Sequence, residues 1–168
     1  MDMLFVMNAQ NSFLSQDGSV YMGEKAETLK VRLLDYISSY RGKVLFFREI
    51  HAMDDTFFVN EKTHSIATTT DCLIHNSLRG KTCNFFDHSR YDSFHGTSLE
   101  PHLKREKVTS VTMVGVETHT SVLFTAESLR NRDYPVKVIE PCCMSRDDYM
   151  HSCAVSLMAN SLGVRIGS

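Results

Sequence analysis

Ser121 has the residue type and the position of an enzyme nucleophile. It lies in the stretch VTMVGVETHTSVLFTAESL, residues 111–129, where an apolar run ends at Val116 and a helical pattern begins. A sharp turn from strand to helix presents a side chain at the end of a sheet, where several enzymes place their nucleophile. A serine in a first helical turn also serves for a local backbone hydrogen bond. The stretch therefore has two interpretations, a nucleophile or an ordinary helix residue.

Glu49 and His51 have a spacing that suits a metal site. One intervening residue on an extended segment directs both side chains to the same face. A carboxylate and an imidazole are suitable ligands for zinc or a similar divalent cation. With 8 histidines in the chain, an E-x-H sequence also arises by chance. One divalent metal is the cofactor that these residues indicate, and no organic cofactor is expected.

Short apolar runs alternate with helical patterns along the chain. The runs predict buried strands over residues 3–7, 43–47, 82–87, 110–116, 136–140 and 164–166. Residues 24–40 predict a helix, and a last helix is expected from an N-cap at Ser145 to Gly163. The apolar positions of that last helix are Met150, Cys153, Ala154, Leu157 and Met158. Alternating strands and helices predict a parallel sheet that is covered on both faces.

Polar side chains follow most of these runs, so they should meet at one edge of the sheet. In open α/β sheets the site lies beyond the carboxyl ends of the strands. The long irregular segment 48–81 belongs to the same edge, and loops of this length are usually functional or mobile. Packing under the last helix is the expected role of the two adjacent cysteines. The converging set is Asn8, Glu49 and His51, Asp87 and His88, residues 117–121, and Cys142 with Cys143.

Length and composition limit the classes of protein. The chain has 168 residues, which suits one domain over 1–168, and its net charge of −2 includes no basic run. Nucleic acid and membrane are therefore not expected partners. The N-terminus has no basic region of a signal peptide. The 5 cysteines lack paired CxxC spacing, which is typical of reduced thiols in a cytoplasmic protein.

Four segments in order resemble the isochorismatase-like cysteine hydrolase superfamily, and most closely its nicotinamidase-type amidases. FVMNAQNSFL is similar to the family motif V-I-D-x-Q-N-D-F, and FFREIHAMDDTFF to T-R-D-x-H. SRYDSFHGTSLEPHL resembles K-x-R-Y-S-A-F-x-G-T-x-L-x-x-L. VGVETHTSVLFTAESL resembles G-V-x-T-D-x-C-V-x-x-T-A. The resemblance implies a Rossmann-like, three-layer α/β/α fold with a mostly parallel six-stranded sheet.

The resemblance also implies a catalytic triad of aspartate, lysine and cysteine, and this chain differs at all three positions. The aspartate position is Asn8, and the cysteine position is Ser121. The lysine position falls on His88, with Ser89 or Arg90 as alternatives. An amide has no useful proton affinity near neutral pH, so Asn8 cannot take the proton that the aspartate takes. A serine hydroxyl is far less acidic than a cysteine thiol and needs a neighbouring base.

A substitute constellation is conceivable on the same positions. His88 would lie near Ser121 as the base, and a third residue would orient its ring. Asp87 is adjacent to His88 in a strand, where neighbouring side chains point to opposite faces. We therefore expect Asn8 to take the orienting role.

Further site features follow from the resemblance. The family's oxyanion hole, with its cis peptide, would fall on Val116, Glu117 and Ser121. Its metal site would use Glu49, His51 and His75, and His64 is an alternative third ligand. Phe13 and Phe58 would stack on a flat ligand. The family commonly forms homo-oligomers, which is the assembly expected here.

Three functions remain open at this stage. The first is hydrolysis of a small-molecule amide, ester or vinyl ether with an altered triad. The second is a catalytically silent relative that binds a small ligand or a protein partner. The third is a purely structural subunit of an oligomer, against which a retained metal site and cis peptide would argue.

Overall fold

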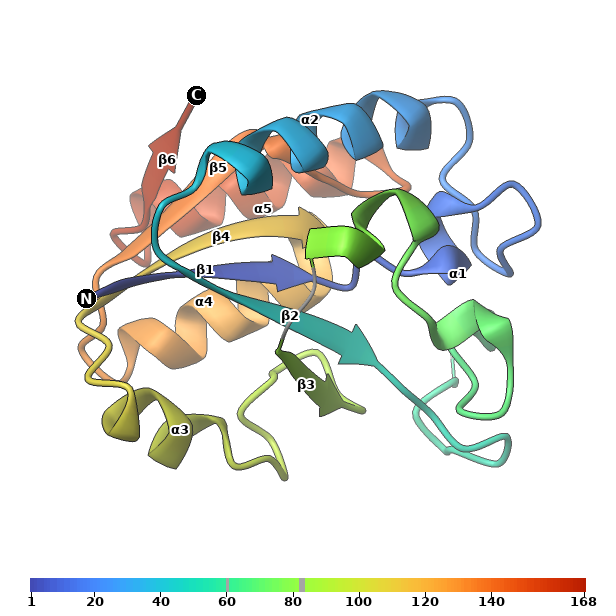
Figure 1. Ribbon diagram of the computed structural model, residues 1–168, viewed down its shortest axis with the longest axis horizontal. Coiled ribbons are helices and arrows are strands. Elements are labelled where there is room, and N and C mark those ends of the chain that lie inside the picture. Colours follow the sequence, from blue (N-terminus) through green and yellow to red (C-terminus); the bar gives the residue numbers. More distant parts are fainter. Residues whose placement is uncertain (60, 82–83) are drawn as a thin grey trace.

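Six parallel strands form the centre of the computed structural model, which describes residues 1–59, 61–81 and 84–168. The strand order is β3-β2-β1-β4-β5-β6, and every neighbouring pair is parallel. This confirms the predicted Rossmann-like α/β/α class (Figure 1). The strands are β1 (Asp2–Met7), β2 (Lys43–Glu49), β3 (Phe85–His88), β4 (Ser110–Val116), β5 (Val136–Met144) and β6 (Arg165–Gly167).

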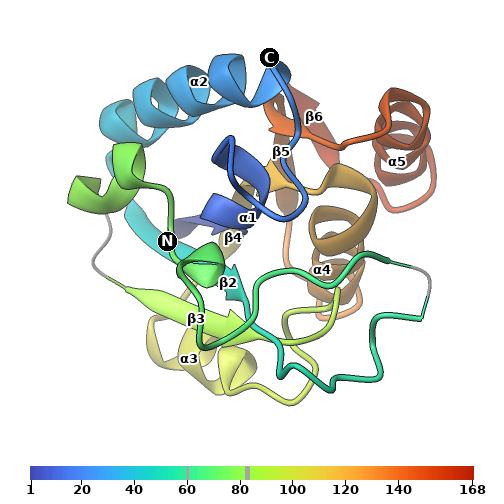
Figure 2. The ribbon, with the colours of Figure 1, turned by 90° about the vertical axis from the view of Figure 1, so that its right-hand side faces the viewer.

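Helices cover both faces of the sheet and form two separate hydrophobic cores. Successive side chains of β1 point to opposite faces of the sheet, so Phe5 belongs to one core and Val6 to the other. Parallel strands that are buried on both faces therefore read as continuous apolar runs. Figure 2 shows the helices around the sheet. One face carries α1 (Asn11–Leu14) and α2 (Lys25–Ser39), and the other α3 (Leu99–Arg105), α4 (Leu123–Arg130) and α5 (Asp148–Asn160).

The carboxyl ends of β1, β2 and β4 point to one edge, and the segment between β2 and β3 lies across it (Figure 1). This segment has little regular structure, as expected, and contains the short 3-10 helices η1 (Thr70–Cys72) and η2 (Asn76–Lys81). Buried Gln10 attaches it to the sheet: its side chain donates to the carbonyls of Glu49 and Cys72, at 2.8 Å each. None of the helices in the described part of the chain combines the length and the apolar character of a membrane span.

Two predicted elements differ from the structure at their ends. The predicted strand 82–87 is observed as Phe85–His88, and residues 82–83 lie outside the described part of the chain. The predicted N-cap at Ser145 is wrong, because α5 begins after Asp147, whose carboxylate accepts from the backbone N–H of Met150 at 2.9 Å. Asp147 is the N-cap because it directly precedes the first helical turn, where its carboxylate reaches a free backbone N–H.

The apolar face of α5 is narrower than its sequence pattern predicts. Only Ala154 and Met158 of the five positions are buried, whereas Met150 and Leu157 are exposed. A short edge strand, β6, leaves less of the sheet for this last helix to cover. Periodicity thus predicted the helix but not how much of it is buried.

Gly115 allows β4 to lie close to β1. Its φ is +113°, and a Cβ built on it would be 2.1 Å from the carbonyl oxygen of Met7. A residue with a side chain would meet both backbone strain and a clash with backbone that cannot move aside.

We expect Gly115→Ala to lower the free energy of unfolding by at least about 2 kcal/mol, from left-handed strain and overpacking. Urea denaturation measures the change. Gly80→Ala is the matched control, because a Cβ there meets nothing within 4 Å, and it should change stability by less than about 1 kcal/mol. Equal losses in the two variants would contradict the close-approach argument.

Candidate functional site

The three positions that correspond to a catalytic triad meet at the carboxyl edge of the sheet. The Asn8 side chain lies between the other two: its Nδ2 donates to Ser121 Oγ at 3.0 Å, and its Oδ1 lies 2.9 Å from His88 Nε2. All three residues are buried. Arg90, an alternative for the lysine position, directs its guanidinium to Asp55 instead. The geometry therefore favours His88 over Arg90.

Local backbone structure directs these side chains to one point. Asn8 follows β1 with a φ of +45°, a left-handed conformation that asparagine tolerates better than most residues. His88 is the last residue of β3. Ser121 lies in the π-helical turn Thr118–Val122, which joins β4 to α4. Three different strand ends thus supply the three side chains.

Asn8 separates Ser121 from His88. The hydrogen bond to Ser121 Oγ comes from an amide N–H, which cannot take a proton. His88 Nδ1 faces the carbonyl of Arg90 at 2.7 Å, and its Nε2 faces Asn8. Burial lowers the pKa of His88, although the charge of Glu49 and the Arg90 carbonyl oppose this. In the described part of the chain, neither ring nitrogen of His88 contacts Ser121.

The predicted cis peptide is present at Val116–Glu117. The Glu117 carboxylate, which is buried, does not face a ligand as a free charge. Arg146 binds it through Nε at 2.9 Å and Nη2 at 2.8 Å, and the Arg146 backbone N–H donates to it at 2.9 Å. This pair lets the start of the π-helical turn stay buried. The oxyanion-hole role of Val116, Glu117 and Ser121 stays a prediction.

A group of three potential metal ligands lies beside Asn8. Glu49, His51 and His64 are buried, and their ligand atoms all lie within 4.8 Å of one another. Asn8 Nδ2 also donates to Glu49 Oε2 at 3.0 Å, so one amide joins this group to Ser121. The group contains His64, the alternative third ligand, and not His75, the predicted one. Ser77 holds the His75 ring instead, since its backbone N–H donates to His75 Nδ1 at 3.2 Å.

The donor set fits a divalent cation. One carboxylate with two imidazoles is a ligand set that zinc uses in catalytic sites. Both imidazoles have an acceptor at Nδ1, which is Asp55 for His51 and the carbonyl of Lys62 for His64, at 2.9 Å each. With the proton on Nδ1, each ring would offer its Nε2 lone pair to a cation beside Glu49. Partners of this kind fix the tautomer of metal-ligating histidines.

Charges within this group shift its ionisation. Burial would raise the pKa of Glu49, but hydrogen bonds from His51 and His64 outweigh burial and lower it. Burial would lower the pKa of His64, but Glu49 raises it overall. Asp55 has a pKa lowered to about 2, mainly by its hydrogen bond with His51. Glu49 thus favours the protonated form of the His64 imidazole.

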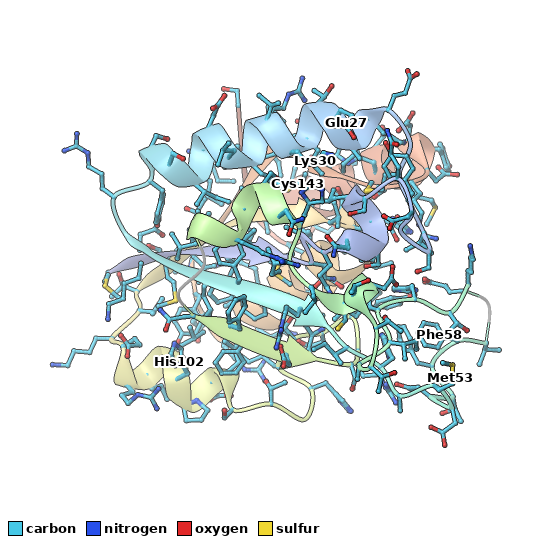
Figure 3. The ribbon with its side chains drawn as sticks, turned by 45° about the vertical axis from the view of Figure 1, so that its right-hand side comes forward. Glu27, Lys30, Met53, Phe58, His102 and Cys143 are labelled. Atoms are coloured by element: carbon cyan, nitrogen blue, oxygen red, sulfur yellow. The ribbon has the colours of Figure 1, made fainter. Side chains whose placement is uncertain are left out.

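The two predicted aromatic residues line this group. Phe58 lies edge-on to His51 and His64, with ring centroids 4.5 and 5.2 Å apart, and Phe13 lies 5.3 Å from His64. Figure 3 shows Phe58 on the loop beyond the end of β2. Phe57, the neighbour of Phe58, stacks on His51 with ring centroids 4.9 Å apart. Ligand binding by Phe13 and Phe58 stays a prediction.

Sequence reasoning missed two charged residues near the site. Asp55 lies four residues after His51 in the segment HAMDD, and this spacing was the available signal. Arg146 follows β5, and nothing in its sequence context relates it to Glu117. The cysteines after that strand are buried, and burial raises the pKa of both thiols. They fit the packing role rather than a reactive pair.

Comparison with known proteins identifies relatives over the whole chain. The isochorismatase domain family matches residues 2–168. An isochorismatase family protein of Bacillus subtilis, PncA, is 22% identical, with 97% of each chain covered. The crystal structure of nicotinamidase/pyrazinamidase PncA from Bacillus subtilis superposes with a TM-score of 0.90, 23% identity and 99% of each chain covered. The crystal structure of PnC1 from L. infantum, in complex with nicotinate, superposes with a TM-score of 0.86 and 19% identity. The match covers 99% of this chain and 91% of the PnC1 chain.

We expect His64→Ala to weaken Zn²⁺ binding by more than about 100-fold, since loss of an outer partner alone costs about 10–100-fold. His75→Ala is the matched control and should leave the affinity unchanged. Competition with a chromophoric chelator measures both. If His75→Ala weakened Zn²⁺ binding more than His64→Ala did, His75 would be the third ligand instead.

His64 should stabilise the metal-free protein in a pH-dependent way. Its pKa is raised above the ordinary value of 6.5. Its contribution is therefore complete below that value and is lost as the pH rises through the raised pKa. The difference in free energy of unfolding between wild type and His64→Gln should be larger at about pH 6 than at about pH 9. Urea denaturation at the two pH values checks this, and a difference that grows with pH would contradict it.

Proposed function

This chain belongs to the isochorismatase-like hydrolase family, and we propose that it binds a small planar amide, or the corresponding acid, without hydrolysing it through Ser121. The site for this ligand is the buried group that Asn8 joins, with Ser121 on one side and Glu49, His51 and His64 on the other. It is the second of the three functions left open by the sequence, with a small molecule as the partner.

One observation carries the proposal: Asn8 donates a hydrogen bond to Ser121 Oγ. A serine attacks a carbonyl only if a base removes its proton as the new bond forms. The neighbour of Ser121 is an amide N–H, which supplies no such base. The hydroxyl keeps its proton and is suited to donate it to a carbonyl or carboxylate oxygen of a bound molecule. Ser121 therefore acts as a binding group.

Other features support a small ring ligand. A divalent cation held by Glu49, His51 and His64 would supply an open coordination position for a ring nitrogen or a carboxylate. Phe13 and Phe58 offer flat apolar walls beside that position. The related PnC1 structure holds nicotinate, a molecule of this type. Asn8 and Ser121 are fully buried, which suits a small ligand rather than a large one.

Altered-triad hydrolysis of the same amide is the second candidate, and the meeting of Asn8, His88 and Ser121 at one buried point favours it. In this reaction Ser121 Oγ bonds to the carbonyl carbon and gives its proton to His88 Nε2. The C–N bond then breaks as the amine takes that proton, and water hydrolyses the acyl-serine. The Asn8 side chain must first rotate away, because it occupies the path between Oγ and Nε2.

We expect the wild-type protein with Zn²⁺ to bind nicotinate in isothermal titration calorimetry and to release no ammonia from nicotinamide. The triple variant Asn8→Asp, His88→Lys, Ser121→Cys should gain ammonia release, because the three positions already meet and the metal group is already in place. Asn8→Asp alone is the matched control and should gain none, since it leaves a serine without a lysine partner.

Wild-type ammonia release that both Ser121→Ala and His88→Ala abolish would contradict the binding proposal and establish the second candidate. Absence of nicotinate binding in the presence of Zn²⁺ would contradict the proposed ligand class. Circular dichroism of each variant distinguishes a lost function from a lost fold.

A further inference from the structure

Among the described residues, the Asp55 carboxylate contacts His51 Nδ1, the Phe57 backbone N–H and Arg90, and none of the three candidate ligand atoms. We propose that Asp55 is a positioning residue, which keeps the Nε2 lone pair of His51 available to a metal ion. This inference rests on the metal-assisted binding proposed above, and it assigns a role to a residue outside the three ligands.

Three hydrogen bonds fix the Asp55 carboxylate. Oδ2 lies 2.9 Å from His51 Nδ1 and accepts from Arg90 Nη1 at 3.1 Å. Oδ1 accepts from the backbone N–H of Phe57 at 3.0 Å. The Asp55 side chain is only 11% exposed, and that of His51 is fully buried. The Asp55 carboxylate is therefore held in one position, where it contacts the His51 imidazole.

The position of the proton on His51 decides whether the ring can bind a metal. With the proton on Nδ1, His51 donates to Asp55 and its Nε2 lone pair is free. In the other tautomer the proton is on Nε2, which lies 2.9 Å from Glu49 Oε1. That proton would donate to Glu49 and occupy the place of the cation. Asp55 accepts but cannot donate when ionised, so it selects the first tautomer.

Arg90 extends this arrangement to the triad side of the site. It donates to Asp55, and its guanidinium lies 5.4 Å from the centre of the Phe57 ring. Its own carbonyl accepts from His88 Nδ1 at 2.7 Å. The loop after β3 is therefore attached to the metal group through Asp55. The positions of this loop and of His51 therefore both depend on the Asp55 carboxylate.

Neighbouring Asp54 provides a matched control. Asp54 is exposed and makes no hydrogen bond or ion pair with another described residue. Asp54→Asn and Asp55→Asn change the charge equally within one loop. Only the second alters the hydrogen bond to His51, so a difference between them isolates the positioning role from the local charge.

The test is Zn²⁺ affinity by competition with a chromophoric chelator, together with the NMR signal of the His51 Nδ1–H proton. We expect Asp55→Asn to weaken Zn²⁺ binding by about 10–100-fold, as loss of an outer carboxylate does elsewhere. The Nδ1–H signal should shift or disappear. Asp54→Asn should change neither quantity, and Asp55→Glu should recover part of the affinity. Thermal unfolding of the metal-free variants separates these effects from misfolding.

Equal Zn²⁺ affinity in wild type and Asp55→Asn would overturn the inference while leaving the metal group intact. Equal losses in Asp54→Asn and Asp55→Asn would also overturn it, because charge alone would then account for both. A wild-type protein that binds no Zn²⁺ would refute the metal premise of the proposed function itself, and this inference with it. Affinity and NMR are measured without substrate, so neither depends on turnover.

Discussion

The side-chain amide of Asn8 is the interaction on which the rest of the site depends. Its two N–H groups donate to Glu49 and Ser121, and its carbonyl oxygen faces His88. A carboxamide has both donors and an acceptor, so it can join a carboxylate, a hydroxyl and an imidazole in one buried network. A carboxylate in the same place would repel Glu49 and would accept, rather than donate, at Ser121. The asparagine therefore changes the direction of the hydrogen bond at the nucleophile position, and with it the chemistry of the site.

The sheet makes this network possible because its strands are parallel. Asn8, Glu49 and His88 follow or end β1, β2 and β3, and Ser121 follows β4, so one edge collects all of them. Backbone features then set the final directions. Asn8 has a left-handed φ, and the cis peptide at Val116 precedes the turn that holds Ser121. The Arg146–Glu117 pair neutralises the one carboxylate that this turn buries.

Sequence reasoning predicted the parts of the molecule that depend on local pattern. The apolar runs gave the strands, and motif register gave the positions of Asn8, Ser121 and the cis peptide. Contacts between distant segments were harder to predict. His64 replaced His75 because the course of a long irregular loop is set by Gln10 and its backbone partners, which no periodicity describes. Asp55 and Arg146 were missed for the same reason. The cap of α5 moved from Ser145 to Asp147 because several capping residues compete within one turn.

The central claim is that Ser121 has no base and remains protonated. The most direct measurement is acylation by an activated nicotinate ester, followed by mass spectrometry of the peptide that contains Ser121. A serine with a working base forms a covalent acyl adduct within a turnover, whereas a hydroxyl that serves only to bind does not. The account predicts no adduct on Ser121 in the Zn²⁺-loaded wild-type protein, and an adduct in the Asn8→Asp, His88→Lys, Ser121→Cys variant. A stoichiometric wild-type adduct on Ser121 that disappears in His88→Ala would contradict it.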